Sequence, residues 1–205
     1  MKNINVVACG VGGQGVLLAT SILANTAMRE GLDVLASEVH GMAQRGGSIV
    51  SHLRIGRELY SPLVTEGSAD LILGFEPAEV LRVLRFAKNR TWIVVNSRPI
   101  MPTTVSIGVS KYPAFEDMVK EYLRFSKFVV EVDAMKLALK AGSLLAQNIV
   151  MLGASVATGI YPMKNEALQS CIQELSPGKY LDVNLKAFEV GFHSVSSRKS
   201  ILTHG

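Results

Sequence analysis

A run of glycines near the N-terminus is the segment best suited to chemistry. It reads Gly10-Val11-Gly12-Gly13-Gln14-Gly15 and matches the pattern G-x-G-x-x-G. In this pattern the first glycine allows a tight turn, the second lets the backbone approach a phosphate, and the third lets a helix pack closely on a strand. The amides at the start of the following helix add hydrogen-bond donors and a positive dipole end. The segment predicts a phosphate-binding turn, although a sharp connection without a ligand fits the same residues.

A second glycine-rich segment, residues 40–47, carries an arginine. It reads His-Gly-Met-Ala-Gln-Arg-Gly-Gly, so that Gln44 and Arg45 precede Gly46 and Gly47. Paired glycines let another backbone or a ligand come close, and an arginine can clamp a phosphate or a carboxylate. A surface turn with a solvated arginine is the alternative. We expect each of the four histidines to be structural or exposed, and His40 is the hardest to dismiss because it opens this segment.

Alternating apolar runs and helical periodicities predict the elements that position these two segments. Strands are expected at residues 4–8, 34–38, 49–55, 71–74, 92–95 and 128–132. Helices are expected at residues 16–28, from Pro77 to about Lys88, and at 115–123, 144–157, 168–175 and 181–192, with 98–113 mostly irregular. This order predicts an α/β fold, a Rossmann-like doubly wound and mainly parallel sheet with helices on both faces and a helical C-terminal part. Both glycine-rich segments then follow the carboxyl ends of strands and can line one crevice.

The expected helix at residues 144–157 is apolar nearly all round. Such a helix is buried, either in the body of its own domain or against another subunit. The core is the more common place for it in a chain of 205 residues. Its sequence leaves both possibilities open.

The composition excludes several classes of function. The formal charge is +4 and the pI about 9.1, but the basic residues are scattered, so we expect no nucleic-acid partner. No segment resembles a signal peptide or a membrane span, so we expect a cytoplasmic protein with no membrane partner. Cys9 and Cys171 lie far apart and lack neighbours at ligand spacing, so neither a metal site nor an iron–sulfur cluster is expected in this chain.

A nucleotide-binding function is an alternative that the first glycine segment supports. Glu38 closes the second expected strand, near the roughly 20-residue offset at which an acid binds the ribose of a dinucleotide. A stand-alone nucleotide-binding module would need nothing more. An NAD-dependent dehydrogenase would also need a catalytic acid, and none of the histidines has an evident carboxylate or lysine context. Both readings stay open at this point.

The two glycine-rich segments, followed by Ser51-His52-Leu53-Arg54, resemble the small subunit of 2-oxoacid:ferredoxin oxidoreductases. Within that superfamily the string in residues 40–47 is similar to the beta (small) subunits of indolepyruvate ferredoxin oxidoreductases. The resemblance covers about residues 3–195 and is strongest in the first 60 or so. It implies one gamma-type domain over residues 1–197, followed by a flexible tail at 198–205.

The resemblance also implies a function. Such complexes oxidatively decarboxylate indole-3-pyruvate and other aryl pyruvates, pass electrons to ferredoxin and transfer the acyl group to coenzyme A. Thiamine diphosphate, magnesium and 4Fe–4S clusters are expected in the large (alpha) subunit, because this chain has neither clustered cysteines nor a Gly-Asp-Gly segment. This chain is then inactive alone and has no catalytic residue. The residues expected near coenzyme A are Gly10, Gly12, Gly13, Gln14, Gly15, His40, Gln44, Arg45 and Gly46.

Overall fold

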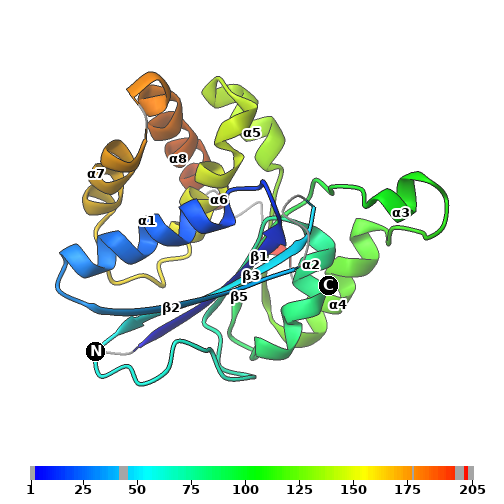
Figure 1. Ribbon diagram of the computed structural model, residues 1–205, viewed down its shortest axis with the longest axis horizontal. Coiled ribbons are helices and arrows are strands. Elements are labelled where there is room, and N and C mark those ends of the chain that lie inside the picture. The colour runs from blue at the N-terminus through cyan, green and yellow to red at the C-terminus, as the bar shows by residue number, and fades with distance from the viewer. Residues whose placement is uncertain (1–2, 42–45, 177, 197–200, 203–205) are drawn as a thin grey trace.

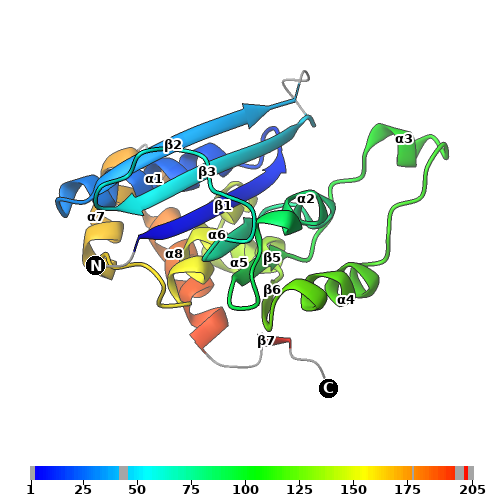
Figure 2. The ribbon, with the colours of Figure 1, turned by 90° about the horizontal axis from the view of Figure 1, so that it is seen from below.

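A single mixed β-sheet forms the centre of the molecule (Figure 1, Figure 2). The computed structural model describes residues 3–41, 46–176, 178–196 and 201–202. Within these residues seven strands lie in the order β2-β3-β1-β4-β5-β6-β7. Their bounds are β1 Ile4–Val11, β2 Asp33–His40, β3 Ser48–Gly56, β4 Leu71–Gly74, β5 Trp92–Asn96, β6 Phe128–Val132 and β7 Ile201–Leu202.

Helices cover both faces of the sheet, as the sequence predicts. One face carries α1 (Val16–Arg29), α5 (Ala134–Ala141), α6 (Gln147–Val156), α7 (Asn165–Leu175) and α8 (Leu181–Ser196) (Figure 1). The other face carries α2 (Pro77–Val83), the 3-10 turn η1 (Leu84–Phe86) and α4 (Phe115–Phe125). The remaining short turns are α3 (Thr103–Ser106), η2 (Leu144–Ala146) and η3 (Gly178–Tyr180).

The two hydrophobic cores follow from the alternation of side chains along the strands. In β1, Val6 and Ala8 belong to the core under α1 and α6, whereas Val7 and Cys9 belong to the core under α2 and α4. A strand that is buried on both faces has no polar side to solvate, so it reads as a continuous apolar run. That run is what the sequence shows at residues 6–9.

The predicted fold class is confirmed, and the strand directions add detail to it. Strands β1, β4, β5 and β6 run parallel, but β3 is antiparallel to β1 and to β2. A hairpin between β2 and β3 is the reason, because parallel neighbours need a crossover of a dozen or more residues. Strand β1 extends to Val11, beyond the predicted end at Ala8, since its last residues pair with β3. Ile201 and Leu202, in the segment expected as a tail, pair with β6.

The expected helix at 144–157 is two elements, the turn η2 and the helix α6. Every residue of α6 from Asn148 to Val156 is buried within this chain, which supports the core position. In contrast, the side chain of Leu145 on η2 is 76% exposed. Sequence reasoning missed α5, although Asp133 caps its first turn and Gly142 ends it in the left-handed region. Among the described helices, none has the length and apolar character needed to cross a membrane.

Helices α6 and α8 approach each other closely because each carries a glycine that faces the backbone of the other helix. A Cβ on Gly153 would lie 2.1 Å from the carbonyl oxygen of Phe188. A Cβ on Gly191 would likewise lie 2.1 Å from the carbonyl oxygen of Val150. Both positions therefore require glycine for steric reasons, even though glycine weakens a helix relative to alanine.

His52 links β3 to the loop that precedes β4, and its protonation should couple the stability of the fold to pH. Its Nδ1 accepts a hydrogen bond of 3.3 Å from the amide of Val64, and its ring packs edge-on against Phe86. Burial, with a smaller effect of the nearby Arg85, lowers the pKa of His52 below its usual value of 6.5. The unfolded chain then binds more protons than the folded one once the pH drops through about 6.5.

We therefore expect the free energy of unfolding to fall as the pH is lowered from about 7.5 to about 5.5. The substitution His52→Asn keeps an acceptor near the Nδ1 position but takes up no proton there. Urea unfolding at a series of pH values should show a shallower pH dependence for His52→Asn than for the wild type. Equal slopes in the two proteins would show that His52 is not the group responsible.

Candidate functional site

The first glycine segment forms a tight turn between β1 and α1. Gly13 has a φ of 99° and Gly15 a φ of 72°, which are left-handed values that favour glycine. Gly15 is the N-cap of α1, and no described side chain bonds to the amides of the helix's first turn. These amides are therefore available to an anion.

Gly46 and Gly47, at the end of the second glycine segment, lie against the first segment. The amide of Gly12 donates to the carbonyl oxygen of Gly47 at 2.9 Å, and the amide of Gly46 donates back to Gly12 at 3.5 Å. The structure thus brings Gly46 and Gly47 to the first segment at one edge of the sheet. Gln44 and Arg45 lie outside the described residues, and His40 is the last residue of β2. Because its amide is already bonded to Gly47, Gly12 can approach a ligand closely but cannot donate that hydrogen bond to it.

Gln14 and Gly10 have a structural task within this edge. The side-chain oxygen of Gln14 accepts from the amide of Val11 at 2.9 Å, and its nitrogen donates to the carbonyl of Phe75 at 2.8 Å. The side chain thereby joins the ends of β1 and β4. A Cβ on Gly10 would lie 2.7 Å from the same Gln14 oxygen, so glycine at position 10 makes room for this bridge. Gly10 is therefore needed for packing rather than for direct approach to a ligand.

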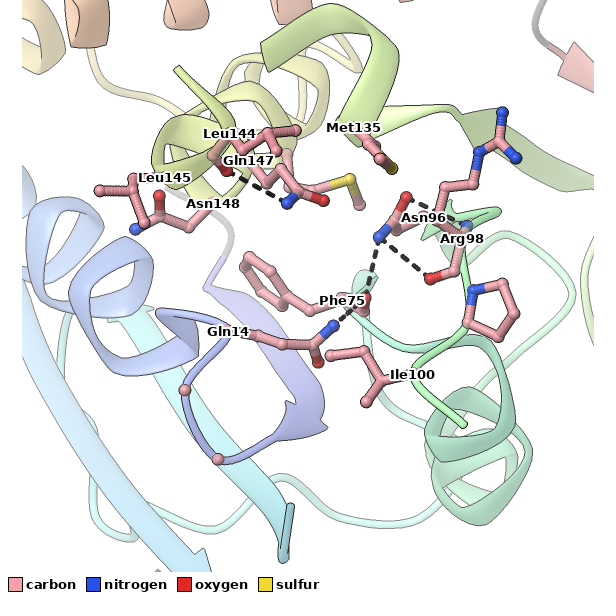
Figure 3. Close-up of a pocket in the computed structure, with 14 residues that line it drawn as sticks. Gln14, Phe75, Asn96, Arg98, Ile100, Met135, Leu144, Leu145, Gln147 and Asn148 are labelled. Atoms are coloured by element: carbon pink, nitrogen blue, oxygen red, sulfur yellow. Dashed lines mark hydrogen bonds between the residues drawn. The ribbon is translucent and has the colours of Figure 1, made fainter. Parts of the chain in front are cut away.

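A cavity of about 410 Å³ opens between these turns and the helices above them (Figure 3). It lies at the carboxyl ends of β1, β4 and β5, where the chain leaves β1 for one face of the sheet and β4 for the other. Such a switch point is where open α/β sheets bind ligands. The lining residues are Gly12, Gly13, Gln14, Phe75, Asn96, Arg98, Pro99, Ile100, Met135, Leu144, Leu145, Gln147, Asn148 and Met151.

The chemical character of this cavity is apolar with carboxamides. Four of its described lining residues are Asn or Gln, and none is Asp or Glu. Of the predicted site residues, Gly12, Gly13 and Gln14 line the cavity. Gly10, Gly15 and Gly46 do not line it, but each contacts a residue that does. The cavity can therefore take a neutral or anionic molecule with amide groups and an apolar part.

Asn148, on α6, is a candidate that sequence reasoning missed. The residue is only 7% exposed, and its side chain makes no hydrogen bond with the described part of the chain. It lies against Gly15, where an added Cβ would come within 2.5 Å of its side-chain nitrogen. Asn148 lines the cavity beside the free amides of α1, so its carboxamide can bond to a ligand or a water molecule there. A polar residue within an otherwise apolar helix was the signal that the sequence offered.

Asn96 and Arg98 shape the far wall of the cavity. The buried Asn96 donates to the carbonyl of Phe75 at 3.2 Å and accepts from the amide of Ala134 at 3.2 Å. The guanidinium of Arg98 turns away from the cavity in Figure 3 and bonds to Asp133 at 2.6 Å. This hydrogen bond holds the pKa of Asp133 below its usual value. Both side chains therefore position the ends of β4, β5 and α5 around the cavity.

Glu38 cannot take the role of a ribose-binding acid at this site. In a dinucleotide fold the strand that ends in this acid lies next to β1. Here β3 lies between them, because Glu38 pairs with Ser51, which in turn pairs with Ala8. Two strand spacings separate Glu38 from β1 by about 10 Å. The geometry therefore argues against both nucleotide-binding alternatives.

The two cysteines lie on different elements, Cys9 in β1 and Cys171 in α7, and both are buried. Burial, together with the charges of Glu79 and Glu76, raises the pKa of the Cys9 thiol. A thiol with a raised pKa stays protonated and is a poor nucleophile or metal ligand. Among the described residues, no group of three or more His, Cys, Asp or Glu is placed to hold a metal ion.

Comparisons with known proteins agree with this fold. The sequence profile of the family described as pyruvate ferredoxin/flavodoxin oxidoreductase matches residues 5–194. The indolepyruvate oxidoreductase subunit IorB of Archaeoglobus fulgidus is 41% identical over 96% of this chain and 98% of its own length.

Two solved structures share the fold. The pyruvate oxidoreductase subunit PORC of Thermotoga maritima matches all of both chains at 23% identity and a TM-score of 0.72. The 2-oxoglutarate:ferredoxin oxidoreductase of Magnetococcus marinus, solved with 2-oxoglutarate, coenzyme A and succinyl-CoA bound, matches 99% of this chain and 32% of its own at 19% identity and a TM-score of 0.72. The resemblance to small subunits of indolepyruvate ferredoxin oxidoreductases is confirmed by the IorB match. This chain belongs to the pyruvate ferredoxin/flavodoxin oxidoreductase family.

Proposed function

We propose that this chain is the small subunit of a heteromeric enzyme that converts indole-3-pyruvate, and other aryl pyruvates, to the acyl-CoA. One 2-oxo acid, one coenzyme A and two oxidised ferredoxins give one acyl-CoA, carbon dioxide, two reduced ferredoxins and a proton. The bond between the keto carbon and the carboxylate breaks, and a carbon–sulfur bond forms. Support comes from the similarity to IorB, which extends over 98% of that relative.

The chemistry of the large subunit completes this proposal. Thiamine diphosphate with magnesium would activate the 2-oxo acid there, and 4Fe–4S clusters would carry electrons to ferredoxin. The contribution of this chain is then to bind and orient coenzyme A.

The observation that carries the proposal is the cavity at the carboxyl edge of the sheet. Its apolar wall and its carboxamides match the pantetheine arm of coenzyme A, which has two amides on an aliphatic chain. The free amides at the start of α1 and the buried Asn148 lie beside it for a phosphate or an amide group. The absence of carboxylates from the described lining suits a ligand that carries negative charge.

A reconstitution experiment tests the proposal. The purified chain alone should reduce no acceptor dye, and the large subunit alone should reduce little. Together they should show CoA-dependent dye reduction with indolepyruvate, and assays with phenylpyruvate and pyruvate would establish the preference. Heat-denatured small subunit serves as the control. Full activity of the large subunit without this chain would contradict the proposal.

The substitution Asn148→Leu tests the cavity itself. It keeps the size of the side chain but removes both hydrogen-bonding groups, so we expect the KM for coenzyme A to rise about tenfold with little change in kcat. Asn25→Leu, the same substitution on α1 at a side chain that bonds to Ser21 within its own helix, is the matched control. An unchanged KM in Asn148→Leu would place coenzyme A elsewhere.

A further inference from the structure

Residues 98–113 leave the body of the molecule as an arm with α3 near its tip (Figure 1, Figure 2). The turn that follows α3 is closed by local hydrogen bonds. In one of them the amide of Val109 donates to the carbonyl of Thr104 at 2.8 Å. Ile107 is 68% exposed and Val109 is 75% exposed. The tip of the arm is therefore ordered by its own backbone rather than by packing on the sheet.

Both ends of the arm are held by one buried carboxylate. Glu76, which is 2% exposed, accepts from the amide of Ile100 at 3.4 Å and from the hydroxyl of Tyr112. The same side chain caps α2 by accepting from the amide of Glu79 at 3.1 Å. The base of the arm is thus fixed to the core while its tip projects.

The surface of the arm is apolar and free of acids. Ile100 and Met101 are 45% and 50% exposed, in addition to the two residues at the tip. Residues 98–113 contain no Asp or Glu; of their two charged residues, Arg98 is already paired with Asp133, so Lys111 supplies the positive charge of the arm. Several exposed apolar side chains on one projecting segment are typical of a contact with another molecule. A recess of about 250 Å³ at the base, lined in part by Pro77, Met101 and Tyr112, adds space for an apolar side chain from outside.

We propose that this arm docks on the large subunit, in an apolar groove with an acidic side chain opposite Lys111. The inference rests on the proposed function, because that function supplies the partner. Pro99 and Ile100 belong to the base of the arm and also line the candidate cavity, so the base of the arm lies directly beside the site. In the Magnetococcus structure a domain of this fold makes up 32% of a longer chain, which shows that such a domain can be continuous with further domains of an oxidoreductase.

The test measures affinity between purified subunits by biolayer interferometry. The double substitution Ile107→Asp, Val109→Asp should raise the Kd for the large subunit by about 30-fold or more, as expected for the centre of an interface. The Tm of the variant should stay unchanged, since both side chains are mostly exposed. A second variant, Ile107→Ser with Val109→Ser, removes the apolar surface without new charge and should raise the Kd about tenfold.

A matched control uses the opposite edge of the sheet. Tyr60→Asp with Leu63→Asp also replaces two exposed apolar side chains, which are 90% and 52% exposed in the loop after β3. This control should bind like the wild type. An unchanged Kd in both arm variants would overturn the inference, and so would loss of a self-association that the wild type shows, since the arm would then bind a second copy. Failure of the wild type to bind the large subunit would instead overturn the proposed function.

Discussion

The free energy of unfolding of a Gly191→Ala variant will be about 3 kcal/mol lower than that of the wild type. Alanine normally stabilises a helix by about 1 kcal/mol relative to glycine, so the sign of this effect is the informative part. The added Cβ would lie 2.1 Å from the carbonyl oxygen of Val150, on the backbone of α6. A backbone atom cannot rotate away as a flexible side chain can. The two helices must therefore separate, which opens space in the core around Phe188.

Urea unfolding followed by circular dichroism measures this difference. Gly178→Ala is the control, because nothing lies within 4 Å of a Cβ at that position. We expect the control to change stability by less than about 0.5 kcal/mol. If Gly191→Ala were as stable as the control, the close approach of α6 and α8 would not be present in solution.

A Gly15→Ala variant will lose about 2 to 3 kcal/mol of stability and will bind coenzyme A more weakly. Two causes add at this position. The φ of 72° is a left-handed value that an alanine adopts at a cost, and the new Cβ would overlap the side chain of Asn148 at 2.5 Å. Because Asn148 lines the candidate cavity, its displacement changes the site as well as the core.

A double-mutant cycle separates these causes. Asn148→Ala removes the overlapped side chain, so Gly15→Ala should cost about 1 kcal/mol less in the Asn148→Ala background than in the wild type. The cost that remains is the backbone strain. Strictly additive effects would mean that the two residues do not touch, and the contact between α1 and α6 would then have to be revised.

Local sequence patterns were sufficient for most of the elements. The apolar run in β1 and the amphipathic spacing in α4 depend only on residues close in the chain, and both elements begin where they were expected, although each extends further along the chain. The place of β3 between β1 and β2 was not accessible in this way. Which strands pair is decided by contacts distant in sequence, and residues 41–47 form a connection too long to give the short turn signal of a hairpin.

The candidate site was predictable only in part. The glycines predicted a tight turn, and the structure has this turn, with Gly13 and Gly15 in left-handed conformations. Their pattern alone gave no indication that Gln14 would bridge two strands or that the amide of Gly12 would be taken up by Gly47. Asn148 could not be assigned to the site at all, because it reaches α1 only when α6 packs across the sheet.

The single carboxylate that holds both ends of the arm makes the arm structurally independent of the sheet. Since Ile100 and Tyr112 meet at Glu76, the segment between them can change its length and sequence while the sheet keeps its geometry. The core then keeps the fold, while the sequence of the arm can change to fit a different partner. If arms are exchanged between related subunits, each subunit should therefore bind the large subunit that matches its new arm.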